Sequence, residues 1–129
     1  MNIIKIAEKL YKEANPNSKF TQPPSIVYEA IESRYKKWLE LTSEQKKLYP
    51  FEHYARILSC RNNLTKEQAQ QCLNWGYKIS HKRFSKNEFI VKKKNTNSQY
   101  IDEEGTTINI KTFWNIREKS LWNKNWYII

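Results

Sequence analysis

Two histidines, His53 and His81, are the side chains of this 129-residue chain that could exchange protons near neutral pH. Cleavage of RNA without a metal ion needs a general base, a general acid and a cation that stabilises charge developing on the phosphate. The histidines could supply the base and the acid, and Lys82 or Arg83 could supply the cation. A metal-independent ribonuclease is therefore a third hypothesis, behind the two developed below, and it requires the fold to bring the two histidines together.

Residues for other common chemistries are missing from the sequence. Gly76 and Gly105 are the only glycines, so neither glycine-rich loop that cradles nucleotide phosphates is present. The two histidines with Cys60 and Cys72 are separated by six, eleven and eight residues, which matches no compact zinc motif. We expect no catalytic residues, no metal and no cofactor, and we expect both cysteines to lie in the core of a protein from a reducing compartment.

A cluster of cations in residues 77–94 is the most informative feature of the chain. The segment reads YKISHKRFSKNEFIVKKK and contains seven Lys or Arg against one acid, Glu88. Such a cluster can neutralise phosphates, and the aromatic rings within it offer flat faces on which bases can stack. Nucleic acid, either DNA or RNA, is the expected partner, and the expected contacts are Lys78, Lys82, Arg83, Lys86, Lys92, Lys93, Lys94, Lys111 and Arg117.

Composition explains only part of the net charge of +10. Lysine outnumbers arginine 18 to 5, as an AT-rich genome would favour, but codon bias would raise lysine everywhere. Residues 77–129 nevertheless carry +6, whereas residues 1–42 and 43–76 carry +2 each. Lysines can also complement a helix C-terminus or protect an exposed sheet edge, and these structural roles remain alternatives for the cluster.

Aromatic residues form a second group near the end of the sequence. Four of them fall within the last sixteen residues, and most should fill the core. Exposed ones would stack on bases or anchor a protein interface, and the candidates are Tyr77, Phe84, Trp122 and Trp126. A small inhibitor or adaptor of the kind encoded by phages and mobile elements, which binds another protein or a nucleoprotein, is thus the second hypothesis.

Four helical segments are expected before residue 80. An apolar stripe predicts a helix over residues 3–14, and a second helix should follow Pro24 with Ser25 as its N-cap. Capping boxes at Thr42 and Thr65 predict the starts of the third and fourth segments, with a restart of the third at Pro50.

The fourth helix is expected to run to about residue 79, and extension to residue 83 would give it a basic C-terminal end containing Lys78 and Lys82. Residues 51–60 and 65–79, joined by a short turn, have the order of a helix-turn-helix unit. The second of these helices would direct its glutamines and Asn74 to solvent or to adenine edges, and a solvent-facing role is favoured.

Strands are expected after residue 81. Residues 89–94 and 106–114 have strand patterns on either side of a turn signal at residues 102–105, and residues 95–99 resemble a hairpin loop. A helix competes from Thr112 onward, and residues 122–129 could form a last strand. The fold class is therefore α+β: one domain over residues 1–129, mainly helical in 1–80, with a small antiparallel β-ribbon and an aromatic-rich C-terminal segment in 81–129.

No apolar run approaches the eighteen residues of a membrane-spanning helix, and the first residues do not resemble a secretory signal. We expect a cytoplasmic protein without a membrane partner, and the sequence leaves its oligomeric state open. The leading hypothesis is a non-enzymatic nucleic-acid-binding protein that contacts phosphates with a basic helix end and a β-ribbon.

Overall fold

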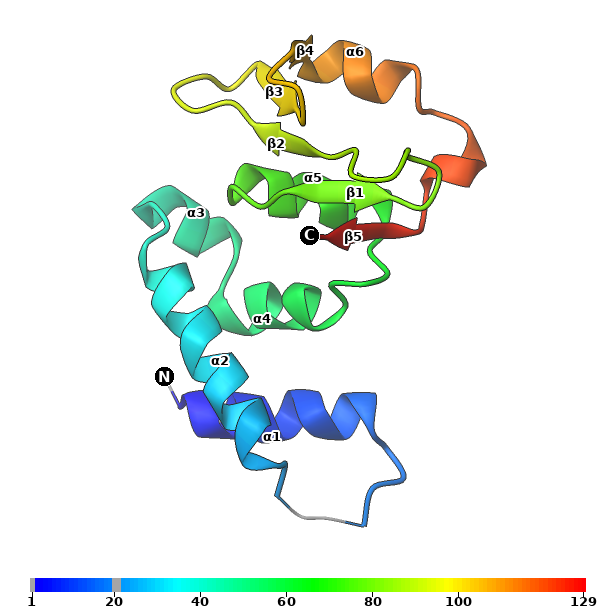
Figure 1. The fold of residues 1–129 in the computed structure, drawn as a ribbon. Coiled ribbons are helices and arrows are strands. Elements are labelled where there is room, and N and C mark those ends of the chain that lie inside the picture. Colours follow the sequence, from blue (N-terminus) through cyan, green and yellow to red (C-terminus); the bar gives the residue numbers. More distant parts are fainter. Residues whose placement is uncertain (1, 20–21) are drawn as a thin grey trace. The chain divides into compact units, whose positions relative to one another are not determined.

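The computed structural model describes residues 2–19 and 22–129. The chain forms two compact units, a first unit of residues 1–59 and a second unit of residues 60–129. Helices make up the first unit, and a sheet with helices makes up the second, so the predicted α+β class is confirmed (Figure 1). The expectation of a single domain stays a prediction.

The first unit consists of four helices, because the third predicted segment restarts as a separate helix after Pro50. The N-terminal capping box of the third helix is confirmed, since Thr42 Oγ1 accepts a hydrogen bond from the Gln45 amide at 3.2 Å. The expected N-cap of the second helix is wrong, because Ser25 is its first helical residue and Pro24 holds the cap position. The helices are α1 (Ile3–Ala14), α2 (Ser25–Leu39), α3 (Ser43–Leu48) and α4 (Phe51–Ser59).

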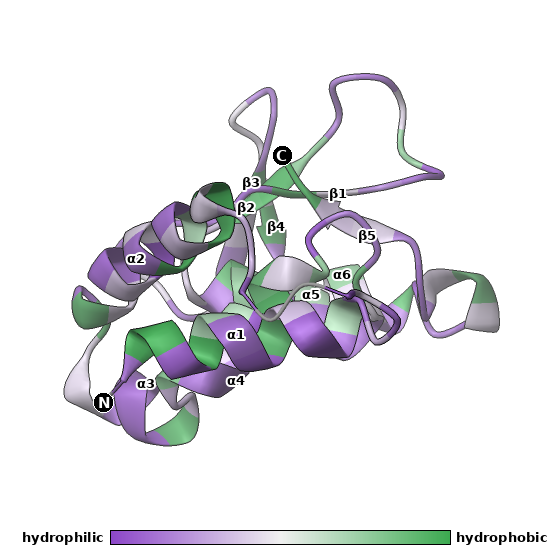
Figure 2. Cartoon of the chain, turned by 90° about the horizontal axis from the view of Figure 1, so that it is seen from below, coloured by the Kyte–Doolittle hydropathy of each residue, from purple (hydrophilic) through white to green (hydrophobic). Residues whose placement is uncertain are grey.

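Amphipathic helices give the first unit its core. Hydrophobic and hydrophilic residues alternate along α1 (Figure 2), and the apolar side buries Ala7 and Leu10. Ile31 of α2 is also buried, and α4 contributes most of the remaining core through Phe51, Tyr54, Ala55, Ile57 and Leu58.

The second unit contains one five-stranded sheet, which is antiparallel throughout, with the strand order β4-β3-β2-β1-β5. The two segments predicted as a ribbon, residues 89–94 and 106–114, belong to this antiparallel sheet, but they do not pair with each other because β3 lies between them. The expected last strand is present as β5. The elements in chain order are α5 (Lys66–Asn74), β1 (Ile79–His81), β2 (Ile90–Lys92), β3 (Gln99–Asp102), β4 (Thr107–Asn109), α6 (Ile110–Asn115), the 3-10 helix η1 (Ser120–Trp122) and β5 (Trp126–Ile128).

The two faces of this sheet have different surroundings. Side chains alternate between faces along a strand, and paired residues of neighbouring strands share a face. The register therefore puts a group of buried side chains on one face, here named the covered face: Ile79, His81, Ile90, Tyr100, Trp126 and Ile128. Buried residues of α5 and α6 pack against them, namely Ala69, Cys72, Leu73, Phe113 and Trp114.

Large rings fill the centre of the covered face. Trp126 is fully buried, lies 5.1 Å from Trp114 between ring centroids, and donates its indole N–H to the Trp122 carbonyl at 2.7 Å. Trp114 donates to the Tyr100 hydroxyl at 2.8 Å. Each buried polar edge of these rings therefore has a partner, as stable burial of Trp and Tyr requires.

The expected length of the fourth helix is wrong. Its capping box forms as predicted, with Thr65 Oγ1 accepting from the Gln68 amide at 3.2 Å, but the helix ends at Asn74. Gly76 then turns the chain with φ of +94°, a backbone conformation that residues other than glycine rarely adopt. Residues 79–81 continue as β1 because they pair with both β2 and β5. Lys78 and Lys82 consequently do not lie on a helix end.

The strand predicted over residues 106–114 is also shorter than expected. It stops after Asn109, whose side-chain oxygen accepts from the Thr112 amide at 3.1 Å and caps α6. The competing helix therefore starts two residues before Thr112. The predicted helix-turn-helix stays a prediction, because α4 and α5 belong to different units.

Candidate nucleic-acid interface

The predicted cations gather at two ends of the sheet in the second unit. Lys92, Lys93 and Lys94 lie where β2 ends, beside the start of β3. Lys111 belongs to the same end, since α6 begins next to the β2–β3 loop, with the Ile110 amide donating to the Ser98 carbonyl at 2.9 Å. This part of the sheet is named the lysine end.

A groove at the lysine end brings three of these side chains together. It has a volume of about 480 Å³ and lies between the last turn of α5 and the β2–β3 loop. No carboxylate is among the residues that line it: Asn74, Trp75, Gly76, Lys92, Lys93, Lys94, Asn95, Thr96 and Asn97. It is named the lysine groove. Its lysine and asparagine side chains are hydrogen-bond donors of the kind that contact phosphate oxygens.

Local hydrogen bonds fix the shape of the loop beside the groove. The Lys93 amide donates to the Gln99 carbonyl at 3.0 Å, and the Ser98 amide donates to Thr96 Oγ1 at 3.1 Å. Asn95 takes up a left-handed conformation with φ of 64°, which asparagine tolerates better than most residues. The predicted hairpin loop is confirmed with different bounds: it spans residues 93–98, because Gln99 already belongs to β3. Its hydrogen bonds hold the three lysines on a defined backbone.

The electrostatics of the lysine groove leave a positive charge unbalanced. The C-terminal end of α5 carries a partial negative charge of about half a unit, which complements one lysine at most. Lys93 Nζ lies 3.5 Å from the Gln99 side-chain oxygen, which is a neutral partner. The protein itself therefore does not neutralise the groove.

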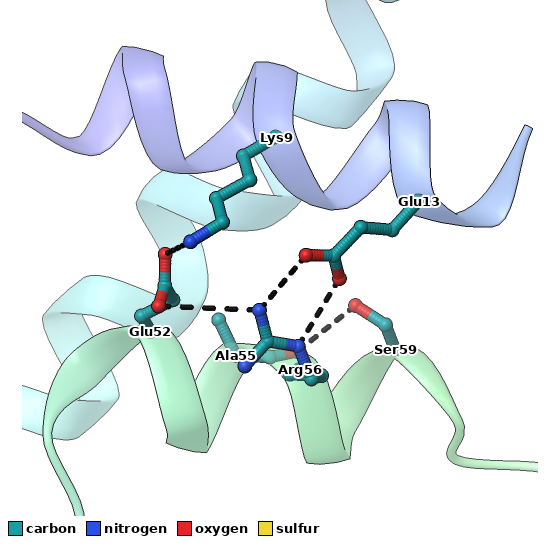
Figure 3. Close-up of polar contacts among 6 residues, drawn as sticks. All are labelled: Lys9, Glu13, Glu52, Ala55, Arg56 and Ser59. Atoms are coloured by element: carbon teal, nitrogen blue, oxygen red, sulfur yellow. Dashed lines mark hydrogen bonds and ion pairs between the residues drawn. The ribbon is translucent and has the colours of Figure 1, made fainter. Parts of the chain in front are cut away.

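Ion pairs are distributed unequally between the two units. In the first unit, Lys9 Nζ lies 3.0 Å from Glu52, and Arg56 donates to both carboxylate oxygens of Glu13 at 3.0 and 3.1 Å (Figure 3). These contacts lower the pKa of the Glu13 carboxyl, chiefly through the hydrogen bond from Arg56. The second unit contains thirteen Lys or Arg and six Asp or Glu, yet its described residues form no ion pair.

The opposite end of the sheet has mixed charge. Lys82, Arg83 and Lys86 lie in the connection between β1 and β2, and the acidic turn of residues 102–104 follows the paired end of β3. Glu88 accepts from the Ser85 amide at 2.8 Å, and Glu103 accepts from the Phe89 amide at 3.3 Å. The predicted contact residues are therefore divided between a purely cationic end and this mixed-charge end.

Arg117 is held by aromatic rings. Its guanidinium carbon lies 3.8 Å from the ring centroid of Phe113, 5.1 Å from that of Trp122 and 5.6 Å from that of Phe84. One terminal nitrogen donates to the Phe113 carbonyl at 3.0 Å, and burial lowers the pKa of the side chain. Arg117 thus stabilises the packing of these rings, and its predicted contact with nucleic acid stays a prediction.

The four predicted stacking residues differ in exposure. Tyr77, Phe84 and Trp122 are partly exposed, although Phe84 and Trp122 already contact Arg117. Trp126 was wrongly predicted as a stacking residue, because it is fully buried on the covered face and cannot meet an external base.

His81 is not available to a phosphate as an acid or a base. His81 is 1% exposed; its Nε2 lies 2.7 Å from the Lys124 carbonyl, and its Nδ1 accepts from the Arg83 amide at 3.0 Å. Burial lowers the pKa of this ring; the hydrogen bond to the Lys124 carbonyl opposes the change, and nearby Arg83, Arg117 and Lys82 add to it. His53 lies on α4 in the other unit, beside Tyr49. Because both nitrogens of the His81 ring are hydrogen-bonded to the backbone in the core, neither is free to exchange a proton with RNA. We therefore do not propose a ribonuclease.

The cysteines also differ from each other. Cys72 is buried, which raises the pKa of its thiol to about 12, but Cys60 is exposed, so its expected place in the core is wrong. The described residues contain no group of three or more His, Cys, Asp or Glu placed to hold a metal ion. Within the same residues, no helix has the length and apolar character to cross a membrane.

One surface was missed by sequence reasoning. The face of the sheet opposite the covered face, here named the open face, carries partly exposed apolar side chains: Phe89, Val91, Ile101 and Tyr127. Alternation along the predicted strand could have placed Val91 on one face of a sheet. That Phe89, Ile101 and Tyr127 share this face could not be predicted, because it depends on how four strands pair. Comparison with protein families, curated proteins and solved structures found no match to this chain.

Proposed function

We propose that this protein binds nucleic acid without catalysing a reaction, and that the lysine groove contacts the phosphates. The observation that carries the proposal is a groove lined by Lys92, Lys93 and Lys94, with no carboxylate, in a unit whose described cations form no ion pair. A polyanion would supply the charge that the protein itself does not. The proposed contacts come from a strand end and a loop rather than from the basic helix end expected from the sequence.

Phosphate contacts have a measurable signature in the dependence of binding on salt. Each neutralised phosphate releases condensed counterions, so log K falls with log salt by about 0.9 per contact for duplex DNA and about 0.7 for single strands. Engagement of all three groove lysines should therefore give a slope of about two to three from the groove alone. Contacts from Lys78 or Lys111 would increase it.

The test compares charge reversal at the two ends of the sheet. In fluorescence anisotropy at low salt, the variant Lys92→Glu, Lys93→Glu, Lys94→Glu should lose at least about tenfold in affinity for short DNA and RNA, with a reduced salt slope. The matched control is Lys82→Glu, Arg83→Glu, Lys86→Glu, which reverses the same number of charges at the mixed-charge end. It should retain most of the affinity. Absence of wild-type binding at low salt, or equal losses in both variants, would contradict the proposal.

A further inference from the structure

The open face is apolar where an antiparallel sheet usually presents polar side chains to water. Tyr127 pairs with Ser80, and Val91 pairs with Ile101, so these four side chains share the face. Phe89 immediately precedes Ile90, whose side chain is on the covered face, and therefore points to the open side. All of them except Ser80 are partly exposed.

Two aromatic rings flank a small residue on this face. Ser80 is buried between the neighbouring strands, and its hydroxyl donates to the Glu88 carbonyl at 2.7 Å. Tyr127 lies on β5, to one side of β1, and Phe89 precedes β2, on the other side. Two strand spacings separate the backbone positions of Phe89 and Tyr127 by about 10 Å. Both aromatic side chains are partly exposed, whereas Ser80 between their strands is buried.

Cations border the rings on this surface. Lys78 Nζ lies 5.0 Å from the ring centroid of Phe89, which places both side chains on the open face. Lys92 pairs with Tyr100 of the covered face, so the next residue, Lys93, lies on the open face, where its Nζ reaches the Gln99 side-chain oxygen. Lys93 thus belongs both to the open face and to the lining of the lysine groove. At the other end of the open face, Glu103 accepts from the Phe89 amide and marks the boundary with the mixed-charge end.

We infer that the ligand of this protein is a single-stranded nucleic acid, whose bases stack on Phe89 and Tyr127 while its phosphates contact Lys78 and the lysine groove. This inference rests on the proposed function and specifies the form of the ligand. Aromatic rings accept any base, because every base has a flat face, but the bases of a duplex are already stacked on one another. Positive charge next to the rings is the feature that favours nucleic acid over an apolar protein partner.

Variants that remove the aromatic rings but keep apolar side chains test the inference. Anisotropy at low salt should show tighter binding of a short labelled oligo(dT) or oligo(U) than of a duplex of equal length. The double variant Phe89→Leu, Tyr127→Leu should lose roughly tenfold or more of the single-strand affinity, with much less effect on the duplex. The control Ile101→Val should bind like wild type, because it changes an apolar side chain of the same face and keeps both rings.

Each outcome separates this inference from the proposed function. Equal affinity for single strand and duplex, or unchanged single-strand affinity in the double variant, would overturn stacking and leave phosphate binding intact; the rings would then be available to a protein partner. Absence of binding to either nucleic acid would overturn both proposals. Photocrosslinking of wild-type protein to an oligonucleotide containing 4-thiouracil requires no variant to fold. Crosslinks should map to Phe89 or Tyr127, and crosslinks confined to other residues would contradict the inference.

Discussion

At the scale of a single residue, His81 is held in its neutral form by the fold. The Arg83 amide donates to Nδ1, so Nε2 carries the hydrogen and donates to the Lys124 carbonyl. A second proton on Nδ1 would oppose the Arg83 amide inside a buried site that already faces Arg83, Arg117 and Lys82. The ring therefore links the stability of the second unit to pH.

The first prediction follows from the lowered pKa of His81. In the unfolded chain the ring takes up a proton near its ordinary pKa of 6.5, whereas the folded protein resists protonation. The stabilisation is therefore complete above pH 6.5 and is lost as the pH falls, with a slope of at most about 1.4 kcal/mol per pH unit. Urea unfolding followed by tryptophan fluorescence between pH 7.5 and 5 should show this loss.

The variant His81→Gln isolates the contribution of the ring. Its side-chain amide can still donate to the Lys124 carbonyl, but it does not titrate. It should be less stable than wild type at pH 7.5, because it leaves the Arg83 amide without its acceptor, and it should lose less stability on acidification. A parallel pH dependence in both proteins would show that other groups are responsible.

At the scale of the element, Gly76 separates a helix from a strand. It follows the α5 C-cap residue Trp75 and has a φ of +94°, which allows β1 to begin three residues later. An added Cβ would meet nothing within 4 Å, so space does not require a glycine here. The backbone conformation is the only constraint that the described surroundings impose.

We predict that Gly76→Ala lowers the free energy of unfolding by about 1 to 2 kcal/mol, entirely through backbone strain. Gly105 offers a matched control, because its φ is +81° and an added Cβ would also meet nothing within 4 Å. Gly105→Ala, in the turn between β3 and β4, should have a similar cost. Chemical denaturation of both variants would test this, and a neutral effect of Gly76→Ala would mean that the helix can end in another way.

Elements that depend on local chemistry could be predicted from the sequence. The capping boxes at Thr42 and Thr65 and the turn at residues 102–105 each rest on residues within four positions of one another. The change from helix to strand near Gly76 could not be located, because the pairing of β1 with Trp126–Ile128 decides it from more than forty residues away. The same holds for the candidate site. The three consecutive lysines could be recognised in the sequence, but the open face could not be predicted, because its residues are brought together by the pairing of several strands.

At the scale of the whole molecule, charge is balanced differently in the two units. The first unit carries ten bases and seven acids, with ion pairs between its helices, whereas the second carries thirteen bases and six acids. Mutual repulsion among the cations of the second unit destabilises it in the absence of an anion. Exposed pairs such as those in Figure 3 contribute little to stability, because water screens them.

Salt should therefore affect the two units in opposite directions. Raising NaCl from about 20 mM to about 500 mM shortens the Debye length from roughly 20 Å to below 5 Å and screens the repulsion in the second unit. Amide hydrogen exchange should then become slower in β1, β2 and β5, and unchanged or slightly faster in α1 and α4. Faster exchange in the strands at high salt would contradict this account of the charge.

The position of β5 also has a consequence for the order in which the second unit folds. β5 pairs with β1 on one side and with Leu64 on the other, where the Leu64 amide donates to the Trp126 carbonyl at 2.7 Å. The hairpins β2–β3 and β3–β4 close short loops, whereas joining β5 to β1 closes a loop of 44 residues and carries a larger entropic barrier. The local hairpins should therefore form first, and burial of Trp126 should report the late, rate-limiting step.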